Sequence, residues 1–252
     1  MTFDVAAEAY DRFMGRYSAQ LAPQLADVAG VKRGQRALDV GCGPGALTGE
    51  LIARLGAAAV AAVDPSGSFI AAVRQRQPGV DVRKASAEAL PFADGAFDAS
   101  LAQLVVHFMS DPVAGLGEMR RVTRSGGIVA ACVWDYGGGR GPLGPFWEAA
   151  RRLDANVRDE SALAGARDGH LSGLLADAGL RDVEATPLTA GLRHESFDAW
   201  WEPFEHGVGP AGAYVASLDR GQAAALRELC RSMLPEAPFT LTATAWAARG
   251  LA

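Results

Sequence analysis

Short apolar runs recur along the chain and predict the strands of a buried sheet. The runs cover residues 37–40, 59–63, 80–85, 97–102, 128–133 and 183–188. Between most of them, apolar residues recur three or four positions apart, which is the period of an amphipathic helix. Residues 239–246 instead alternate between apolar and polar side chains, as a strand with one less buried face does. Alternating strands and helices predict an α/β fold with a doubly wound, largely parallel sheet.

A glycine-rich turn follows the first of these runs and leads into a predicted helix. Gly41, Gly43 and Gly45 allow positive φ and let a ligand approach the backbone closely. Their spacing also fits a dinucleotide-binding turn. Pro44, however, lacks the N–H that an anion would use, and Asp39 places a negative charge beside the turn. Both residues favour S-adenosylmethionine, whose sulfonium and ammonium groups suit the acid and whose carboxylate suits the free N–H groups of the turn.

Residues 38–45, Leu-Asp-Val-Gly-Cys-Gly-Pro-Gly, closely resemble motif I of the class I S-adenosylmethionine-dependent methyltransferases. The resemblance is strong over residues 30–135 and weaker in the flanks. It is to the small-molecule type, like the methyltransferases of ubiquinone and menaquinone biosynthesis and like methyltransferase domain 11. It implies a Rossmann-like, seven-stranded sheet in which strand seven is antiparallel and pairs with strand six, with a helical N-terminal lid.

Two further motifs continue this resemblance along the chain. Asp64 ends the second apolar run, about 20 residues after the turn, where the family's acid accepts hydrogen bonds from both ribose hydroxyls. The alternative role for Asp64 is a helix N-cap, which Ser66 could fill equally well. Residues 86–92 are similar to the family's adenine-binding turn, but Ser86 stands where an acid is usual. Either Ser86 or Glu88 would then take over the contact with adenine.

The resemblance thereby implies a set of cofactor-binding residues. The segment at residues 10–17 looks like the family's N-terminal cap, from which Arg16 and Tyr17 would close over the methionine part of the cofactor. The alternative is an amphipathic helix packed on the core. The complete predicted set is Arg16, Tyr17, Asp39, Gly41, Cys42, Gly43, Asp64, Pro65, Ser86, Ala87, Glu88 and Gln103.

The acceptor side is less well defined by the sequence. Three residues are candidate general bases by residue type, namely His107, Glu205 and His206. His107 is the one that directly follows a predicted strand, but no motif selects among the three, so no base is assigned. The Gly- and Pro-rich residues 134–145 predict a mobile loop in which Trp134 and Tyr136 offer apolar surface for an acceptor, or else a simple linker. Residues 190–235 predict a cap inserted between strands six and seven, held together by Trp200 and Trp201.

The composition of the chain limits the number of domains and the kinds of binding partner that we expect. The 252 residues predict one methyltransferase domain, with a lid at 1–30, a cofactor-binding core at 31–135 and substrate-side elements at 136–252. A net charge of −5 and no long basic run argue against nucleic acid as a partner. Cys42, Cys132 and Cys230 are scattered and predict no metal site. With no signal peptide and no apolar run of about 18 residues, we expect a cytoplasmic protein with no membrane partner, either a monomer or a homodimer.

The resemblance implies an enzyme that transfers a methyl group from S-adenosyl-L-methionine to an oxygen, nitrogen or carbon atom and releases S-adenosyl-L-homocysteine, and the composition favours a small molecule as the acceptor. Residues 102–105, Ala-Gln-Leu-Val, lack the Asn-Pro-Pro-Tyr-type motif of enzymes that methylate nucleobase or glutamine amino groups. Two alternatives stay open at this point. One is a nicotinamide-dependent oxidoreductase that uses the same turn, and the other is a non-catalytic regulatory protein that binds the cofactor.

Overall fold

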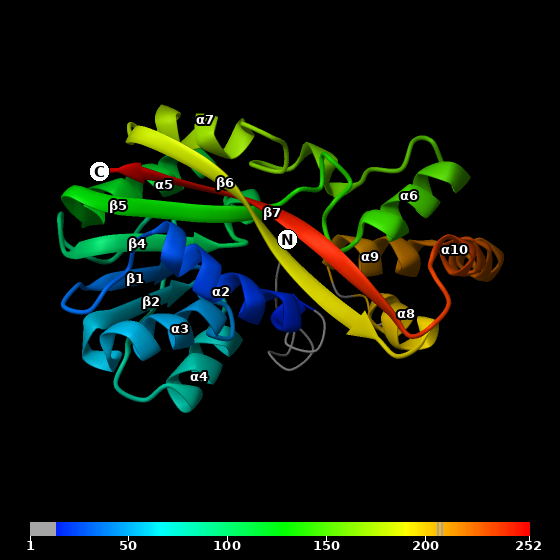
Figure 1. Cartoon of the computed structure of the whole chain (residues 1–252), viewed down its shortest axis with the longest axis horizontal. Coiled ribbons are helices and arrows are strands. Elements are labelled where there is room, and N and C mark those ends of the chain that lie inside the picture. Colours follow the sequence, from blue (N-terminus) through cyan, green and yellow to red (C-terminus); the bar gives the residue numbers. More distant parts are fainter. Residues whose placement is uncertain (1–13, 206, 208) are drawn as a thin grey trace.

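The computed structural model describes residues 14–205, 207 and 209–252. A seven-stranded sheet in the order β3-β2-β1-β4-β5-β7-β6 runs through it, and β7 alone is antiparallel to its neighbours (Figure 1). This confirms the predicted fold class. The strands are β1 (Ala37–Val40), β2 (Val60–Asp64), β3 (Asp81–Lys84), β4 (Phe97–Gln103), β5 (Thr123–Trp134), β6 (Arg181–His194) and β7 (Phe239–Leu251).

Helices follow most of the parallel strands. The α-helices are α2 (Arg16–Val28), α3 (Ala46–Leu55), α4 (Gly67–Arg76), α5 (Pro112–Val122), α6 (Gly144–Leu153), α7 (His170–Asp177), α8 (Phe197–Glu205), α9 (Gly209–Ser217) and α10 (Arg220–Met233). Short 3-10 helices are η2 (Ala57–Ala59), η3 (Val106–Phe108) and η4 (Glu160–Ala162). The start of α5 follows the sequence signal directly, since Asp111 accepts a hydrogen bond from the Ala114 N–H and Pro112 takes the first helical position.

The main hydrophobic core lies around the parallel strands. Every residue of β1 and β2 is buried, as expected for strands that helices cover on both faces. This aliphatic core holds the carboxyl ends of the strands in fixed positions, and ligands of doubly wound sheets bind beyond those ends.

Three strands are longer than the sequence predicted. β5 begins at Thr123 rather than 128, because residues 124–127 form an irregular part of the strand. Phe97 pairs with Thr123 there, whereas Ala99 already pairs with Ile128. β6 runs to His194 and β7 to Leu251, since each supplies the other with backbone partners well beyond the rest of the sheet. The segment between these two strands therefore begins after His194 rather than near residue 190.

A second, aromatic core lies at the far end of the β6–β7 hairpin (Figure 1). It joins α6 to α8, α9 and α10, and its largest members are Phe146, Trp147, Phe197, Trp200, Trp201 and Phe204. Phe146 stacks on Phe204 with ring centroids 4.7 Å apart. We call this group of helices the cap. No helix in the described part of the chain is both long enough and apolar enough to cross a bilayer.

Candidate cofactor and acceptor site

The glycine turn after β1 is folded onto the end of β2. The backbone N–H groups of Gly41 and Cys42 both donate to the Val63 carbonyl, at 2.8 and 2.9 Å. The Gly43 N–H donates to Asp64 Oδ2 at 2.9 Å. These three N–H groups are already partnered, so the prediction that they are free for the carboxylate of the cofactor is wrong. The turn instead serves to fix the two acids at the ends of β1 and β2.

The glycines of this turn are needed for two different reasons. A Cβ on Gly41 would lie 2.4 Å from Val105 Cγ2, so the chain after β4 fills that space. A Cβ on Gly43 would meet no atom of the described residues within 4 Å, so Gly43 faces open space. Both residues have positive φ, +71° and +52°. Gly41 therefore serves internal packing, and Gly43 leaves room on the ligand side.

Asp39 is a fully buried acid at the end of β1. The Thr48 hydroxyl of α3 donates to its Oδ2 at 2.6 Å, whereas Oδ1 has no hydrogen-bond partner among the described residues. Burial raises the pKa of Asp39 to about 7, and the nearby Asp64 adds to this effect while the Thr48 bond opposes it. An unpartnered buried carboxylate oxygen is costly unless a ligand completes it. A cationic ligand would satisfy both the atom and the charge.

Asp64 is the second acid of the site. Its Oδ2 accepts from Gly43 and its Oδ1 accepts from the Ser66 N–H at 2.8 Å. The residue is only 6% exposed, and burial raises its pKa. Ser66, not Asp64, is the N-cap of α4. A carboxylate can accept about four hydrogen bonds, so two remain for a ligand with paired hydroxyls.

The predicted adenine turn lies next to Asp64. The Ala85 N–H donates to the Asp64 carbonyl at 3.2 Å, which holds the exposed Ser86 at this end of β3. Glu88 points elsewhere, since its Oε1 accepts from the Ser110 N–H at 2.7 Å and from the Asp111 N–H. Of the two candidates for the adenine contact, Ser86 is therefore the better placed. Ala87 is buried beneath the turn, while Pro65 is exposed beside Asp64.

Gln103 connects the end of β4 to the N-terminal helix. Its Nε2 donates to the Ser18 carbonyl at 3.0 Å, and its buried Oε1 has no partner among the described residues. The next residue, Leu104, has a φ of +60°, which is rare for a side chain of this kind and marks local strain. This bend brings the next residue, Val105, against Gly41. No signal in the sequence identified the bend.

The candidate general bases do not converge. His107 is buried against Phe108 and Tyr136, and burial lowers its pKa to about 3, so it is neutral at ordinary pH. Its Nδ1 has no partner among the described residues. Glu205 lies in the cap, where its Oε1 accepts from Trp201 Nε1 at 2.8 Å. His206, like residues 1–13 of the predicted lid, lies outside the described residues.

The loop after β5 is tied down by hydrogen bonds. Asp135 is 1% exposed and accepts from Arg140 Nε at 2.6 Å and from the Gly138 N–H at 2.9 Å. Trp134 and Tyr136 are buried, although Tyr136 also lines a small pocket with Trp147 and Glu160. Trp134 packs edge-on against the ring of Tyr17, with the centroids 5.8 Å apart. The loop thus supports the N-terminal helix.

Glutamine side chains fasten this helix, α2, to the edge strand β6. Gln20 donates to the Gly191 carbonyl at 2.9 Å and accepts from the Gly191 N–H at 3.0 Å. Gln24 makes the same pair of bonds with Thr189, at 2.8 and 3.3 Å. Four helical residues rise about 6 Å and two strand residues about 6.7 Å, so the two spacings match. The side-chain amides therefore take the place of a neighbouring strand and protect the edge of the sheet.

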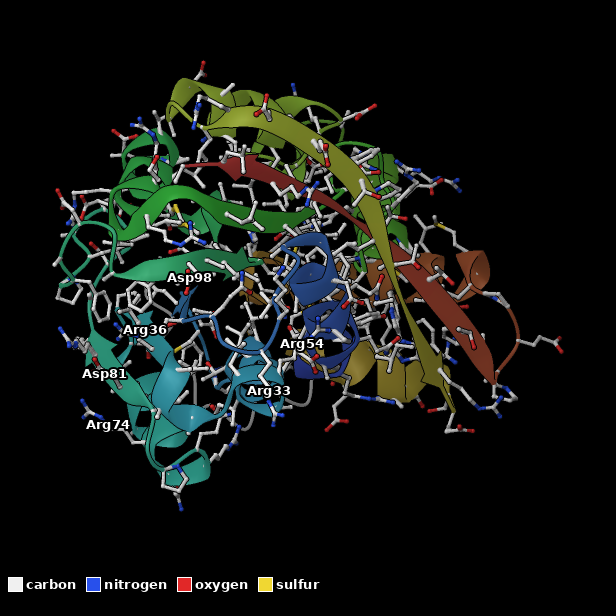
Figure 2. The ribbon with its side chains drawn as sticks, turned by 60° about the vertical axis from the view of Figure 1, so that its left-hand side comes forward. Arg33, Arg36, Arg54, Arg74, Asp81 and Asp98 are labelled. Carbon is white, nitrogen blue, oxygen red and sulfur yellow. The ribbon has the colours of Figure 1, made fainter. Side chains whose placement is uncertain are left out.

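On its other side α2 is held by α3. Arg54 donates from Nη1 to Asp27 Oδ1 at 2.7 Å and from Nη2 to the Pro23 carbonyl at 3.0 Å (Figure 2). These bonds hold the second half of α2, whereas its start, with Tyr17 and Ser18, is held at the carboxyl ends of β5 and β4 by Trp134 and Gln103.

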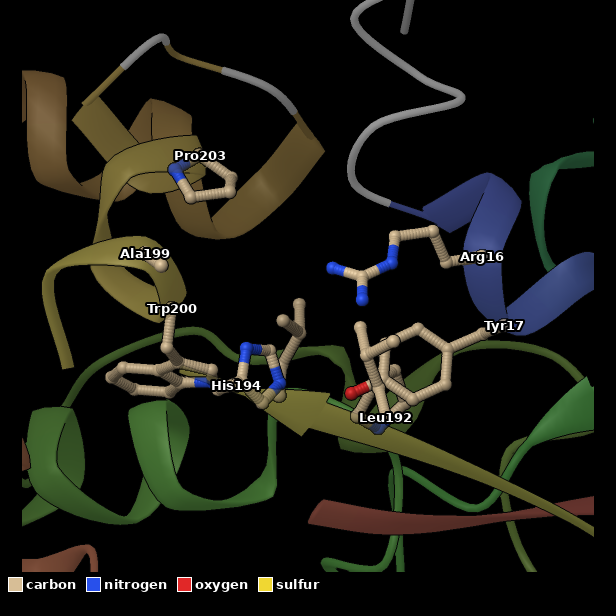
Figure 3. Close-up of a pocket in the computed structure, with 9 residues that line it drawn as sticks. Arg16, Tyr17, Leu192, His194, Ala199, Trp200 and Pro203 are labelled. Carbon is tan, nitrogen blue, oxygen red and sulfur yellow. The ribbon is translucent and has the colours of Figure 1, made fainter. Parts of the chain in front are cut away.

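A pocket opens between the start of α2, the end of β6 and α8 (Figure 3). Arg16 and Tyr17 point into it from α2, opposite His194 and Trp200. The remaining described residues that line it are Pro142, Leu143, Leu192, Ala199 and Pro203. Trp201, by contrast, is 2% exposed and belongs to the aromatic core. Of the two predicted cap tryptophans, Trp200 therefore also contributes to a pocket.

Comparison with known proteins places this geometry in a family. A methyltransferase-domain model matches residues 38–131, which span the glycine turn and strands β1 to β5. Demethylmenaquinone methyltransferase of Paenarthrobacter aurescens is 30% identical over 67% of this chain and 71% of its own length. The chain belongs to the S-adenosylmethionine-dependent methyltransferases. An uncharacterized 37.1 kDa protein in a transposon of Streptomyces fradiae is 29% identical over 67% of this chain, and the match spans only 50% of that relative.

The fold is shared with solved structures of low sequence identity. Geranyl diphosphate C-methyltransferase of Streptomyces coelicolor is 18% identical and superimposes with a TM-score of 0.55, covering 94% of this chain and 80% of its own. The residues present fit S-adenosylmethionine, the cofactor of the family. Asp39 offers an unpartnered buried acceptor to a cation, Asp64 has acceptor capacity for two hydroxyls, and Gly43, whose N–H donates to Asp64, faces open space.

Proposed function

We propose that this chain methylates a small molecule, with the cofactor bound across the ends of β1, β2 and β3. One observation carries the proposal: two buried acids at neighbouring strand ends flank an open glycine, and one of their oxygens has no partner among the described residues. A pyrophosphate would place negative charge against both acids. A sulfonium and a ribose fit the same groups, and bound S-adenosylmethionine supplies a methyl group on a positively charged sulfur.

The predicted cofactor residues take defined roles in this proposal. Asp39 would face the cationic part of the cofactor, Asp64 the ribose, and Ser86 the adenine. Cys42 lies in the turn, where burial raises the pKa of its thiol and keeps it protonated, so it would contribute shape rather than charge. Gln103 would hold α2 over the site through Ser18.

The pocket beside Tyr17 is the proposed acceptor site. Tyr17 joins it to the cofactor side, since this residue packs on Trp134 at the end of β5 and also lines the pocket. In this arrangement the chain's own part in the reaction is to hold the acceptor aligned and to exclude water, because the methyl group is already activated on its sulfur. His107 lies outside the described lining of the pocket, so it is not proposed as a base. The net charge of −5 supports a small molecule rather than nucleic acid as the acceptor.

Calorimetric titration with S-adenosylhomocysteine and, separately, with NAD tests the cofactor. We expect S-adenosylhomocysteine to bind and NAD not to compete with it. Binding of NAD alone would favour the oxidoreductase alternative. Release of S-adenosylhomocysteine from S-adenosylmethionine, measured over a panel of hydroxyl, amine and carbon acceptors, then tests transfer. Tight cofactor binding with no transfer to any acceptor would favour the non-catalytic regulatory alternative.

A further inference from the structure

The end of α4 reaches the glycine turn through two side chains. Gln77, the C-cap residue of α4, donates from Nε2 to the Gly45 carbonyl at 3.0 Å. Next to it, Arg76 donates from Nη1 to the Pro44 carbonyl at 3.3 Å. Gly45 is also the residue from which α3 begins. The N–H groups of the turn are thus held by the end of β2, and two of its carbonyls are held by α4.

Two glycines, one helical turn apart, make room for the side chain of Gln77. A Cβ on Gly45 would lie 3.3 Å from both polar atoms of its amide, and a Cβ on Gly49 would lie 2.9 Å from its Nε2. The helices α3 and α4 therefore lie side by side, with this amide against the two glycines (Figure 1). Gly49 lies inside α3, where alanine would favour the helix more. A glycine at this position leaves the Gln77 amide its space.

The turn also determines which way the amide of Gln77 points. Its Oε1 is buried and has no hydrogen-bond partner among the described residues, while its Nε2 donates to Gly45. A buried acceptor without a partner is costly. With the amide reversed, however, its oxygen would face the Gly45 carbonyl and two acceptors would repel each other. The hydrogen bond to Gly45 therefore fixes the orientation of this side chain.

The opposite end of α4 is attached to the same turn. The Ser66 N–H donates to Asp64 Oδ1 and the Gly43 N–H donates to Asp64 Oδ2, so one carboxylate links the start of the helix to Gly43. The ten residues of α4 span about 15 Å. Asp64 thus holds the turn at Gly43, and Gln77 holds it at Gly45, from the two ends of one helix.

From this geometry we propose that Gln77 is a positioning residue of the cofactor site, which fixes the Gly45 carbonyl and with it the course of the backbone at Gly43. It acts through the turn rather than through contact with the cofactor. This rests on the proposed function, which places the cofactor beside the turn. Without the hydrogen bond from Gln77, the turn would sample further conformations, and cofactor binding would have to order it, which lowers the affinity.

The variant Gln77→Met tests the hydrogen bond, because methionine keeps the length of the side chain and removes the donor. We expect S-adenosylhomocysteine to bind about three- to tenfold more weakly, the factor that corresponds to one hydrogen bond. In the ¹H–¹⁵N spectrum of the ligand-free protein, the Gly43 resonance should also move, since its N–H donates to Asp64 and is sensitive to the course of the turn. Gln75→Met, at an exposed glutamine of the same helix, is the matched control and should change neither.

A second variant, Gly49→Ala, displaces the amide without changing Gln77. Its new Cβ would strike Nε2, which is the flexible end of a side chain and can move away, while alanine favours the helix. We therefore expect weaker binding of S-adenosylhomocysteine together with an equal or higher melting temperature. A residue that only packs α3 against α4 would change the melting temperature and leave the affinity as it is.

The two measurements separate the possible failures. Wild-type affinity in Gln77→Met or in Gly49→Ala, or an unmoved Gly43 resonance in Gln77→Met, would overturn the proposal. Failure of S-adenosylhomocysteine to bind the wild-type protein would instead overturn the proposed function. The Gly43 resonance is read without ligand, so it tests the effect of Gln77 on the turn in either case.

Discussion

The cofactor region and the acceptor pocket are built in different ways. Around the cofactor region, the groups that would contact a ligand are Ser86 and two buried acids, which a hydrogen-bonded backbone turn fixes at strand ends that an aliphatic core holds on both faces. In the acceptor pocket they are side chains from α2, β6 and α8, supported by the aromatic core of the cap. Backbone geometry cannot change without moving the sheet, whereas a side chain can be exchanged on an unchanged backbone. We therefore expect mutations in the cofactor region and mutations in the cap to have separate effects on cofactor affinity and on stability.

Substitution within the glycine turn should have the largest effect. Gly43→Val would fill the open space on the ligand side of the turn, and we expect S-adenosylhomocysteine binding to weaken by more than about 1000-fold, or about 4 kcal/mol. Its unfolding midpoint should also fall, because valine is strained at a φ of +52° even though the new Cβ contacts no described atom. Gly41→Ala is the matched control for packing: it would strike Val105 and should cost about 1–3 kcal/mol of stability. Calorimetry and thermal unfolding measure the two effects. Normal ligand binding by Gly43→Val would show that the turn is not the cofactor site.

Truncation of a side chain in the cap core should lower stability and leave cofactor binding unchanged. Trp201→Ala removes a nearly fully buried ring and its hydrogen bond to Glu205, and we expect a loss of about 3–5 kcal/mol in the free energy of unfolding. Where the variant remains folded, its affinity for S-adenosylhomocysteine should equal that of wild type. Denaturant unfolding followed by calorimetry checks this. A cap variant of normal stability but reduced cofactor affinity would contradict the separation of the two regions.

Asp64 should matter more for binding than for folding. Asp64→Asn keeps one acceptor oxygen for the turn but loses the charge and part of the grip on a ribose, so binding should weaken about 10- to 100-fold. Asparagine is chosen because alanine would leave the Gly43 and Ser66 N–H groups without their acceptors. The readout is the increase in melting temperature that saturating S-adenosylhomocysteine causes. An undiminished increase in the variant would remove Asp64 from the cofactor site.

The smallest expected effect is a pH dependence from Asp39. Its folded-state pKa of about 7 lies above the ordinary value of 3.8. The stabilising contribution of Asp39 is therefore fully present below pH 3.8 and is lost as the pH rises through 7. A cationic ligand needs the ionised acid, so S-adenosylmethionine binding should weaken by up to about tenfold per pH unit below 7 and level off above it. Asp39→Asn should bind weakly at every pH and show a flatter profile. Identical slopes for the two proteins would exclude Asp39 as the titrating group.

Much of the cofactor region could be predicted from the sequence, because its signals are local. The apolar run that ends in Asp39, the glycines that follow it, Asp64 one strand later and the Asp-Pro start of α5 all lie within short stretches, and the structure has each of them where it was expected. The aromatic stripe of α8 likewise indicated a packed cap, which the second core shows.

Tertiary structure alone decided which polar atoms are left for a ligand. The turn N–H groups were predicted free, yet Val63 and Asp64 take them, because hydrogen bonds between strand ends depend on how neighbouring strands are aligned. The burial of Trp134 and the full length of β6 depend in the same way on distant partners. Arg16 and His194 line the same pocket because contacts such as those of Gln20 and Gln24 hold α2 against β6. No local pattern encodes such a contact, since it comes from the packing of segments far apart in the chain.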